Sequence, residues 1–287
     1  MITASQISAL RASTGAGMMD CKAALEEALG DAEKAVDILR KKGVLKAAKR
    51  ADKIAAEGTT KIKIDGNRAV ILELNSETDF VAQGDDFVKL AEEVATDLLA
   101  KNPANLDAAL ASGINDKLTA LTGKIGEKIA LRRFQIVEKS ADEVFGDYVH
   151  MGGKISVLTI LTGTTDSALA REIGMQVAAS NPRATRRDEV DASILEKEKE
   201  VYMVQLKAQN KPENIIENIV KGKMEKFYSE ACLLEQPFIK DEEKSVQKFL
   251  DSNGPGITVK TFYRFELGEG IEKVVKDFAV EVAEQMG

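Results

Sequence analysis

The residues of this chain that could support catalysis are few. His150 is the only histidine, so any nucleophile–base pair would have to be built around that one imidazole. Nothing near it in the sequence marks a nucleophile, and with 47 acidic residues a chance pair of carboxylates is unavoidable. A lone histidine at the end of a predicted strand is most often a surface or half-buried residue. We therefore expect no enzymatic activity.

Two glycine-rich segments lack the context of a phosphate-binding loop. Gly15-Ala16-Gly17 has Asp20 where the dinucleotide fingerprint needs a third glycine, and no predicted strand precedes it. Gly268-Glu269-Gly270 follows a predicted strand but places an acid where a phosphate would sit. Cys21 and Cys232 are too far apart in the sequence to indicate a disulfide framework or a metal site. We expect no cofactor, nucleotide or metal, and two small buried thiols in a reducing compartment.

The most informative segment is the loop 75–82, which joins a predicted strand to a predicted helix. Phe80 and Val81 are apolar residues in an otherwise polar connection, where Thr78 and Asp79 precede them. An aromatic side chain beside a carboxylate on a short, rigid connection suits insertion into a partner protein. The alternative is that Phe80 folds back as a lid over its own core, and the sequence leaves both interpretations open.

Two further loops carry apolar residues. Met18 and Met19 follow a glycine break, and methionine is frequent on partner-binding surfaces. The alternative is that one of them packs inward and the other is incidental. Ile125 and Gly126, at a helix-to-strand junction, are a third exposed candidate. Three apolar loops on separate modules indicate an extended binding surface rather than one pocket.

Charge and hydropathy exclude several classes of partner. The net charge is −7 and the pI is near 5.1, which argues against broad electrostatic binding to nucleic acid. The basic stretch 44–57 is better explained as a solvated linker helix, because no aromatic residues are interleaved for stacking. No apolar run approaches the roughly 20 residues that cross a bilayer, and the N-terminus lacks a signal core. We expect a cytoplasmic protein with no membrane and no direct nucleic-acid partner.

The N-terminal residues predict three short helices. Asp20 is the expected cap of the second helix, and Gly30 the residue that stops it. Asp31 should cap the third helix, which should end at Gly43. Such a module buries little area, so we expect it to dock on something.

The middle of the chain contains a weak internal duplication. The first copy predicts, in order, a hairpin, a helix, a shorter helical region and a strand, at 61–74, 85–100, up to 122 and 129–137. In this hairpin, residues 69–74 are expected to alternate between apolar and polar faces. The second copy predicts a hairpin, a helix and a closing strand, at 144–161, 166–179 and 259–267. The repeated order predicts two related α+β subdomains.

A long helical insertion interrupts the second copy. Apolar residues fall at helical spacing on both sides of Asn210-Lys211-Pro212, which predicts an antiparallel hairpin that serves either self-association or partner contact. Residues 271–286 predict an amphipathic C-terminal helix. The predicted class is α+β, with an N-terminal three-helix module, two related core subdomains, a projecting helical hairpin and a C-terminal helix. The predicted divisions are 1–54, 55–139, 140–186 with 229–268, 187–228 and 269–287.

Four motifs carry a resemblance to a known family. They are Leu10-Arg11 with Thr14 to Lys22, Thr78 to Val81, Lys124 to Glu127, and Arg264 to Glu272. With them the chain closely resembles the bacterial translation elongation factor Ts family, the guanine-nucleotide exchange factors of elongation factor Tu. The resemblance extends over essentially the whole chain. It implies a factor that binds elongation factor Tu·GDP and promotes GDP release, and the competing class is a protein-binding scaffold or chaperone.

The resemblance also implies roles for individual residues. The N-terminal module would be of the ubiquitin-associated type, with Arg11, Met18 and Met19 packing on a helix of the partner's GTPase domain. The helical hairpin resembles the family's dimerisation arm, which would make a homodimer. The C-terminal helix would touch the GTPase domain.

The Phe80 loop would act as a wedge. Asp79 and Phe80, backed by Ile125 and Gly126, would enter near the helices behind the nucleotide's Mg²⁺ site. His150 would make a further contact near the phosphate loop. Glu77 stands where another polar residue is often found, and we expect its charge to tune affinity. The expected partner-binding set is Thr78, Asp79, Phe80, Val81, Arg11, Met18, Met19, Ile125, Gly126 and His150.

Overall fold

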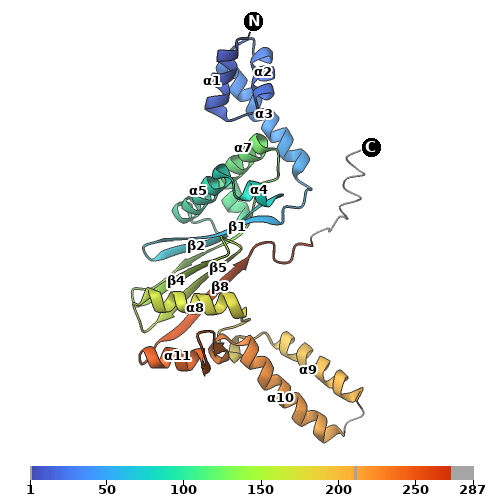
Figure 1. Cartoon of the computed structure of the whole chain (residues 1–287), viewed down its shortest axis with the longest axis vertical. Helices are drawn as coiled ribbons and strands as arrows, with labels where there is room; N and C mark the ends of the chain where they lie inside the picture. Colours follow the sequence, from blue (N-terminus) through green and yellow to red (C-terminus); the bar gives the residue numbers. More distant parts are fainter. Residues whose placement is uncertain (1, 210–211, 273–287) are drawn as a thin grey trace. The chain divides into compact units, whose positions relative to one another are not determined.

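The computed structural model describes residues 2–209 and 212–272, and it has the predicted α+β fold (Figure 1). These residues form two compact units. The first comprises residues 2–63, 72–136 and 266–272, and the second comprises 64–71 and 137–265. The five-part division expected from the sequence stays a prediction.

The N-terminal module of the first unit is a bundle of three helices, as predicted. They are α1 (Ala4–Thr14), α2 (Met18–Glu27) and α3 (Ala32–Arg50). α1 begins in a capping box between Thr3 and Gln6, and α3 begins where the Asp31 carboxylate accepts a hydrogen bond from the Lys34 amide. Their shared core is small, consisting of Leu10, Cys21, Ala24, Leu25, Ala28 and Ala35.

Two predicted helix boundaries in this module are wrong. α3 does not end at Gly43 but continues through it to Arg50, so half of the expected linker helix, residues 44–50, belongs to α3, and residues 51–57 are not helical. The reason is close packing against α7 (Asn115–Ile125), because a Cβ added at Gly123 would lie 2.6 Å from the Gly43 Cα. Gly43 therefore permits a close helix crossing and does not cap a helix. Asp20 is not a cap either, since α2 begins after Gly17 and Asp20 lies in its first turn.

The first sheet has the strand order β1-β2-β3, formed by β1 (Glu57–Asp65), β2 (Arg68–Ser76) and β3 (Ala130–Glu138). The predicted hairpin is confirmed, with its turn at Gly66-Asn67. The predicted alternation along β2 is wrong, because residues 69–76 are all buried. β2 is the central strand of this sheet. When both faces of a central strand are covered, its side chains are buried on both faces and no alternation remains.

Four helical segments connect β2 to β3. They are α4 (Asp79–Ala82), α5 (Asp85–Lys101), α6 (Leu106–Ala109) with a π-helical turn at Leu110–Ile114, and α7. α5 confirms the predicted helix at 85–100 and buries Phe87, Val94 and Leu98. The region expected to be helical up to 122 is helical, and Gly113 (φ 99°) kinks it.

The second sheet has the order β4-β5-β8, formed by β4 (Glu143–His150), β5 (Ile155–Thr162) and β8 (Thr258–Glu266). β4 and β5 are antiparallel, with Glu143 opposite Thr162 and His150 opposite Ile155. α8 (Ser167–Ser180) lies against this sheet so closely that a Cβ at Gly146 would meet the Ala170 carbonyl carbon at 2.2 Å. Hairpin, helix and strand therefore follow in the predicted order.

The insertion in the second unit is the predicted pair of helices. α9 (Ala192–Lys207) and α10 (Glu213–Ala231) lie side by side in Figure 1 and share the buried residues Leu206, Ile216 and Val220. The sequence reasoning missed the smaller elements around them, which are the 3-10 turns Arg187–Glu189 and Leu233–Glu235, β6 (Pro237–Phe238), β7 (Asp241–Ser245) and α11 (Val246–Asn253). The helix predicted over 271–286 lies almost entirely outside the described residues.

Candidate functional site

The loop after β2 presents Phe80 to solvent. Thr78 caps the short helix α4, because its hydroxyl accepts a hydrogen bond from the Val81 amide at 3.3 Å. Phe80 is 86% exposed, Asp79 is also exposed, and Val81 is 8% exposed. The interpretation of Phe80 as a lid over its own core is therefore wrong. Val81 anchors the turn from inside, which leaves Phe80 as its projecting apolar group.

The structure brings the Ile125-Gly126 junction to this turn. α7 ends at Ile125 and is capped by Gly126, whose φ of 86° lies in the left-handed region that glycine adopts readily. Directly after it, the Glu127 carboxylate accepts hydrogen bonds from the Thr78 amide at 3.0 Å and the Thr78 hydroxyl at 2.9 Å. Ile125 and Gly126 are half-buried, so this junction supports the turn more than it presents an apolar surface of its own.

The sequence suggested that Glu77 adds a charge near Phe80. In the structure this charge is not free. The Glu77 carboxylate accepts a hydrogen bond from the Lys128 amide at 2.7 Å and forms an ion pair with Arg50 at 3.0 Å. The side chain is mostly buried between these groups. Its charge is therefore balanced within the protein.

The N-terminal candidates are all exposed. Met19 is 74% and Met18 59% exposed in the first turn of α2, and Arg11 is exposed in the last turn of α1. The alternative that one methionine packs inward is therefore wrong. Lys124 lies against the turn between α1 and α2, since a Cβ at Gly15 would come within 2.6 Å of its Cε.

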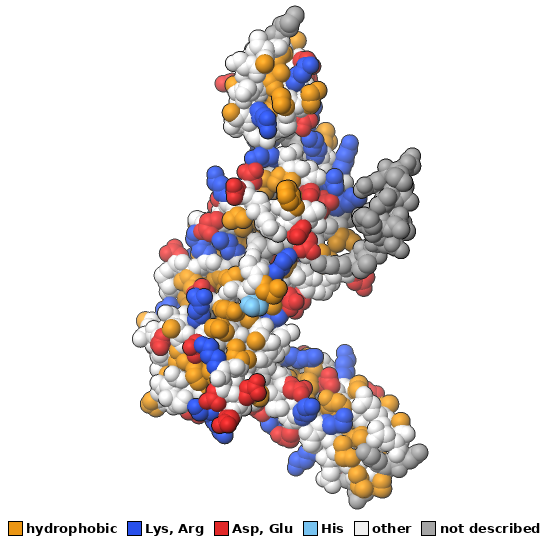
Figure 2. All heavy atoms as spheres, viewed as in Figure 1, with side chains coloured by type: hydrophobic (Ala, Val, Ile, Leu, Met, Phe, Trp, Pro, Cys, Tyr) orange, Lys and Arg blue, Asp and Glu red, His pale blue; other side chains and the backbone are white. Residues whose placement is uncertain are grey.

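His150 belongs to the second unit, at the end of β4. Its imidazole is exposed on the face shown in Figure 2, and Nδ1 lies 3.0 Å from the Tyr148 hydroxyl. The turn that follows holds Met151, Gly152 and Gly153 at positive φ, and Met151 is 70% exposed. His150 and Met151 are thus presented at the tip of a tight hairpin.

A family model for elongation factor Ts matches residues 77–269, which is more than half of the chain. The chain belongs to the elongation factor Ts family. The matched residues include the Phe80 turn, the Ile125-Gly126 junction and His150, whereas the N-terminal helices precede them. The family serves nucleotide exchange in the elongation phase of protein synthesis, and it implies an interaction with elongation factor Tu.

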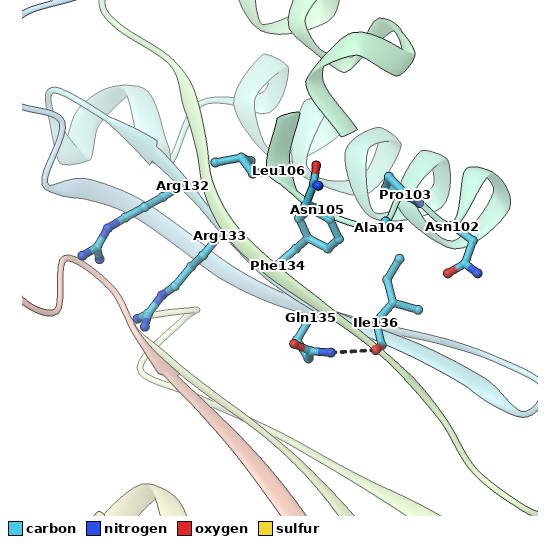
Figure 3. Close-up of a pocket in the computed structure, with 10 residues that line it drawn as sticks. All are labelled: Asn102, Pro103, Ala104, Asn105, Leu106, Arg132, Arg133, Phe134, Gln135 and Ile136. Carbon is cyan, nitrogen blue, oxygen red and sulfur yellow. Dashed lines mark hydrogen bonds between the residues drawn. The ribbon is translucent and has the colours of Figure 1, made fainter. Parts of the chain in front are cut away.

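One pocket, of about 310 Å³, lies in the first unit between the segments 102–106 and 132–136 (Figure 3). Its polar lining consists mainly of amides, and the Gln135 amide nitrogen donates to the Ile136 carbonyl at 2.9 Å. Arg132 and Arg133 extend away from the 102–106 loop in Figure 3. None of the lining residues is acidic or nucleophilic, so the pocket offers no acid–base pair.

The two arginines converge on the buried carboxylate of Glu73. Arg132 reaches it at 2.9 Å and Arg133 at 2.6 Å, and the Gly268 amide donates to it at 2.9 Å. Burial alone would raise the pKa of Glu73, but these hydrogen bonds outweigh burial and hold it below the usual value of 4.5. Arg133 also pairs with Glu269 at 3.0 Å. The glycine-rich segment at 268–270 is therefore tied to the first sheet.

Within residues 2–209 and 212–272, no group of three or more histidine, cysteine or acidic side chains is arranged to hold a metal ion. Cys21 and Cys232 are free and buried, and burial raises the pKa of the Cys232 thiol to about 11. No helix in these ranges is both long and apolar enough to cross a bilayer.

Sequence reasoning missed the residues that hold the Phe80 turn. Glu127 is 49 positions from Thr78, and Lys128 is 51 positions from Glu77. Neither pair has a spacing that marks a contact, because both depend on how β2 and α7 are placed by the fold. The only available signal was that Glu127 stands inside one of the motifs shared with the family.

Proposed function

We propose that this chain binds elongation factor Tu·GDP and promotes GDP release by inserting the Phe80 turn behind the nucleotide's Mg²⁺ site. The observation that carries the proposal is an almost fully exposed phenylalanine on a capped turn, anchored by Val81 and Glu127. An aromatic side chain held out on a fixed turn offers a partner a large apolar surface to bury. Asp79 lies beside it and supplies a charge at the same point.

Magnitudes limit what Phe80 can do alone. A nanomolar nucleotide complex corresponds to about 12 kcal/mol of binding free energy. Burying one phenylalanine contributes roughly 1.5–3 kcal/mol, or about one to two decades in affinity. Phe80 therefore supplies packing, while movement of the partner's Mg²⁺ ligands and phosphate loop supplies the rest. Because coupling is reciprocal, bound GDP lowers the affinity of elongation factor Tu for the factor by the same ratio as the factor lowers its affinity for GDP.

The exposed N-terminal residues would act at the docking step. Arg11, Met18 and Met19 would pack on a helix of the partner's GTPase domain, away from the nucleotide. We expect Arg11→Ala and Met19→Ala to raise the concentration of factor needed for half-maximal GDP release, with little change in the maximal rate. His150 would add a contact near the phosphate loop.

The arm formed by α9 and α10 is proposed to make a homodimer. Val201 and Val204 on α9 and Ile215 on α10 are exposed, and hydrophobic side chains gather along these helices in Figure 2. Light scattering of the isolated chain should give twice the monomer mass, and Val204→Glu should give the monomer mass. A monomeric wild-type chain would contradict the homodimer.

The competing function is that of a scaffold or chaperone that binds through the same modules. It would leave nucleotide release unchanged. The test loads elongation factor Tu with fluorescent GDP, adds excess unlabelled GDP, and follows the loss of fluorescence with and without this chain. An exchange factor accelerates the loss, whereas a scaffold leaves the intrinsic rate.

A further inference from the structure

Two glutamates cross-connect two segments that are far apart in the sequence. Glu77 accepts a hydrogen bond from the Lys128 amide at 2.7 Å, and Glu127 accepts one from the Thr78 amide at 3.0 Å. Each glutamate therefore binds the backbone of the residue that follows the other glutamate. We call this reciprocal pair of contacts the brace.

Additional contacts strengthen the brace and extend it to the end of α3. Glu77 pairs with Arg50, the last residue of α3, at 3.0 Å. The Lys128 ammonium donates to the carbonyls of Ala51 at 2.6 Å and Lys53 at 3.0 Å. Hydrogen bonds to ionised groups are shorter and roughly twice as strong as neutral ones. The brace thus joins the ends of β2, α7 and α3.

The Phe80 turn depends on the brace for its shape. α4 has only four residues, too few to be stable as an isolated helix. Thr78 caps α4 and is also the residue that Glu127 holds, so one contact fixes the point at which the turn leaves the body. Val81 is the buried anchor of the turn, and Phe80 itself is too exposed to hold the turn in place.

We propose that Glu77 and Glu127 are positioning residues for nucleotide exchange, which keep the Phe80 turn in its docking conformation before the partner arrives. This inference rests on the proposed function of Phe80. A turn that is already ordered loses little conformational entropy when it inserts. The brace therefore acts on insertion after docking, and it sets the maximal rate of GDP release rather than the concentration of factor required.

The test compares Glu127→Ala with the wild-type chain on elongation factor Tu loaded with fluorescent GDP, over a range of factor concentrations. Loss of hydrogen bonds to an ionised group should lower the maximal rate about tenfold, with the half-saturating concentration nearly unchanged. Glu127→Gln keeps an oxygen that can accept from the Thr78 amide, so it should recover most of the rate. Glu92→Gln is the matched control, because it removes the ion pairs with Lys61 and Lys63 elsewhere in the same unit and should leave the rate unchanged.

Hydrogen exchange provides a readout of the turn itself. The Thr78 and Val81 amides should exchange about tenfold faster in Glu127→Ala than in the wild-type chain, while α5 stays protected. If these amides exchange faster and the maximal rate of GDP release equals that of the wild type, the inference is wrong. Unchanged exchange at both amides would also overturn it.

The decisive arm adds Glu127→Ala to a Phe80→Ala chain. If the brace acts through Phe80, the second substitution should cause no further loss of rate, whereas general destabilisation would lower the rate again. If Phe80→Ala slows release and Glu127→Ala does not, the proposed role of the brace is wrong and the proposed function stands. If Phe80→Ala itself has no effect, the proposed function fails. Should Glu127→Ala not fold, Glu127→Asp keeps the charge but retracts it by one methylene, and the same outcomes apply.

Discussion

The two sheets differ at the connection between their second strand and the helix that follows. In the first sheet the connection after β2 contains Phe80, which projects into solvent. In the second sheet, the connection from β5 to α8 is short and polar, and Asp166 caps α8 by accepting from the Ala168 amide at 2.8 Å. The same order of elements thus works without an exposed aromatic. The presence of Phe80 in only one connection supports a role in binding rather than in folding.

The ends of the two helices are alike, which makes that difference more informative. The C-cap residue is Asn102 (φ 48°) after α5 and Asn181 (φ 43°) after α8, and each asparagine is in the left-handed conformation. In both helices the asparagine amide donates to a carbonyl four residues earlier. The two copies therefore share a design at the helix end and differ where the helix begins.

β2 of the first sheet buries the charged Glu73, whereas β5 of the second sheet buries the neutral Thr159. Because a buried charge depends on its partners, the largest effect should come from substituting Glu73. Glu73→Gln leaves Arg132 and Arg133 without their carboxylate, which should lower the free energy of unfolding by about 3 kcal/mol at pH 7. The pKa of Glu73 is lower in the folded state than its usual 4.5. Its stabilisation is therefore complete above about pH 4.5 and is lost as the pH falls through the folded pKa.

Urea unfolding of both chains between pH 7 and pH 3 checks this. The difference between wild type and Glu73→Gln should be widest at pH 7 and should shrink below about pH 4.5. Thr159→Val is the control, because its hydroxyl donates to the Ala170 carbonyl at 2.9 Å and does not titrate. A difference for Glu73→Gln that stays constant down to pH 3 would contradict the account.

The caps of the two connections allow a closer comparison. Thr78→Ala and Asp166→Ala each remove a helix cap, so each should lower the free energy of unfolding by about 1 kcal/mol. Only Thr78→Ala should also slow GDP release, because only that cap supports Phe80. The measurement is thermal unfolding together with the fluorescent-GDP assay. Equal slowing by both substitutions would mean that stability alone controls exchange.

The fold was largely predictable because its local signals agree with its packing. The hairpin at 61–74 was predicted from its turn and the alternation around it, and helices were expected at 85–100 and 166–179, where α5 and α8 lie. The predicted helix end at Gly43 was wrong because a glycine inside a helix and a glycine that ends one look the same in a sequence. The role of Gly43 depends on its close contact with Gly123 on the neighbouring helix, which the sequence does not show.

For the candidate site, only the exposed apolar residues could be predicted from the sequence. Phe80, Met18 and Met19 were identified because apolar residues stood out in polar loops. The structural contacts that Glu77 and Glu127 make at the Phe80 turn were not predicted, because acidic residues are common and these contacts cross about fifty positions of sequence. Val81 shows the limit within the motif itself, since the sequence could not tell which of two adjacent apolar residues faces inward.

The smallest expected effect is at the shared helix ends. Asn102→Gly and Asn181→Gly replace asparagine by the residue that suits the left-handed conformation best, so each should change the free energy of unfolding by less than about 1 kcal/mol. The two changes should be similar and neither should alter GDP release. A clear difference between them in urea unfolding would show that the two helix ends are not equivalent.

The most direct test of the central claim is GDP release from elongation factor Tu at a saturating concentration of the Phe80→Ala chain. Because Phe80 is 86% exposed, thermal unfolding should be nearly unchanged. The maximal release rate should fall by about one to two decades, which corresponds to the packing of one phenylalanine in the partner. A maximal rate equal to that of the wild-type chain would contradict the account.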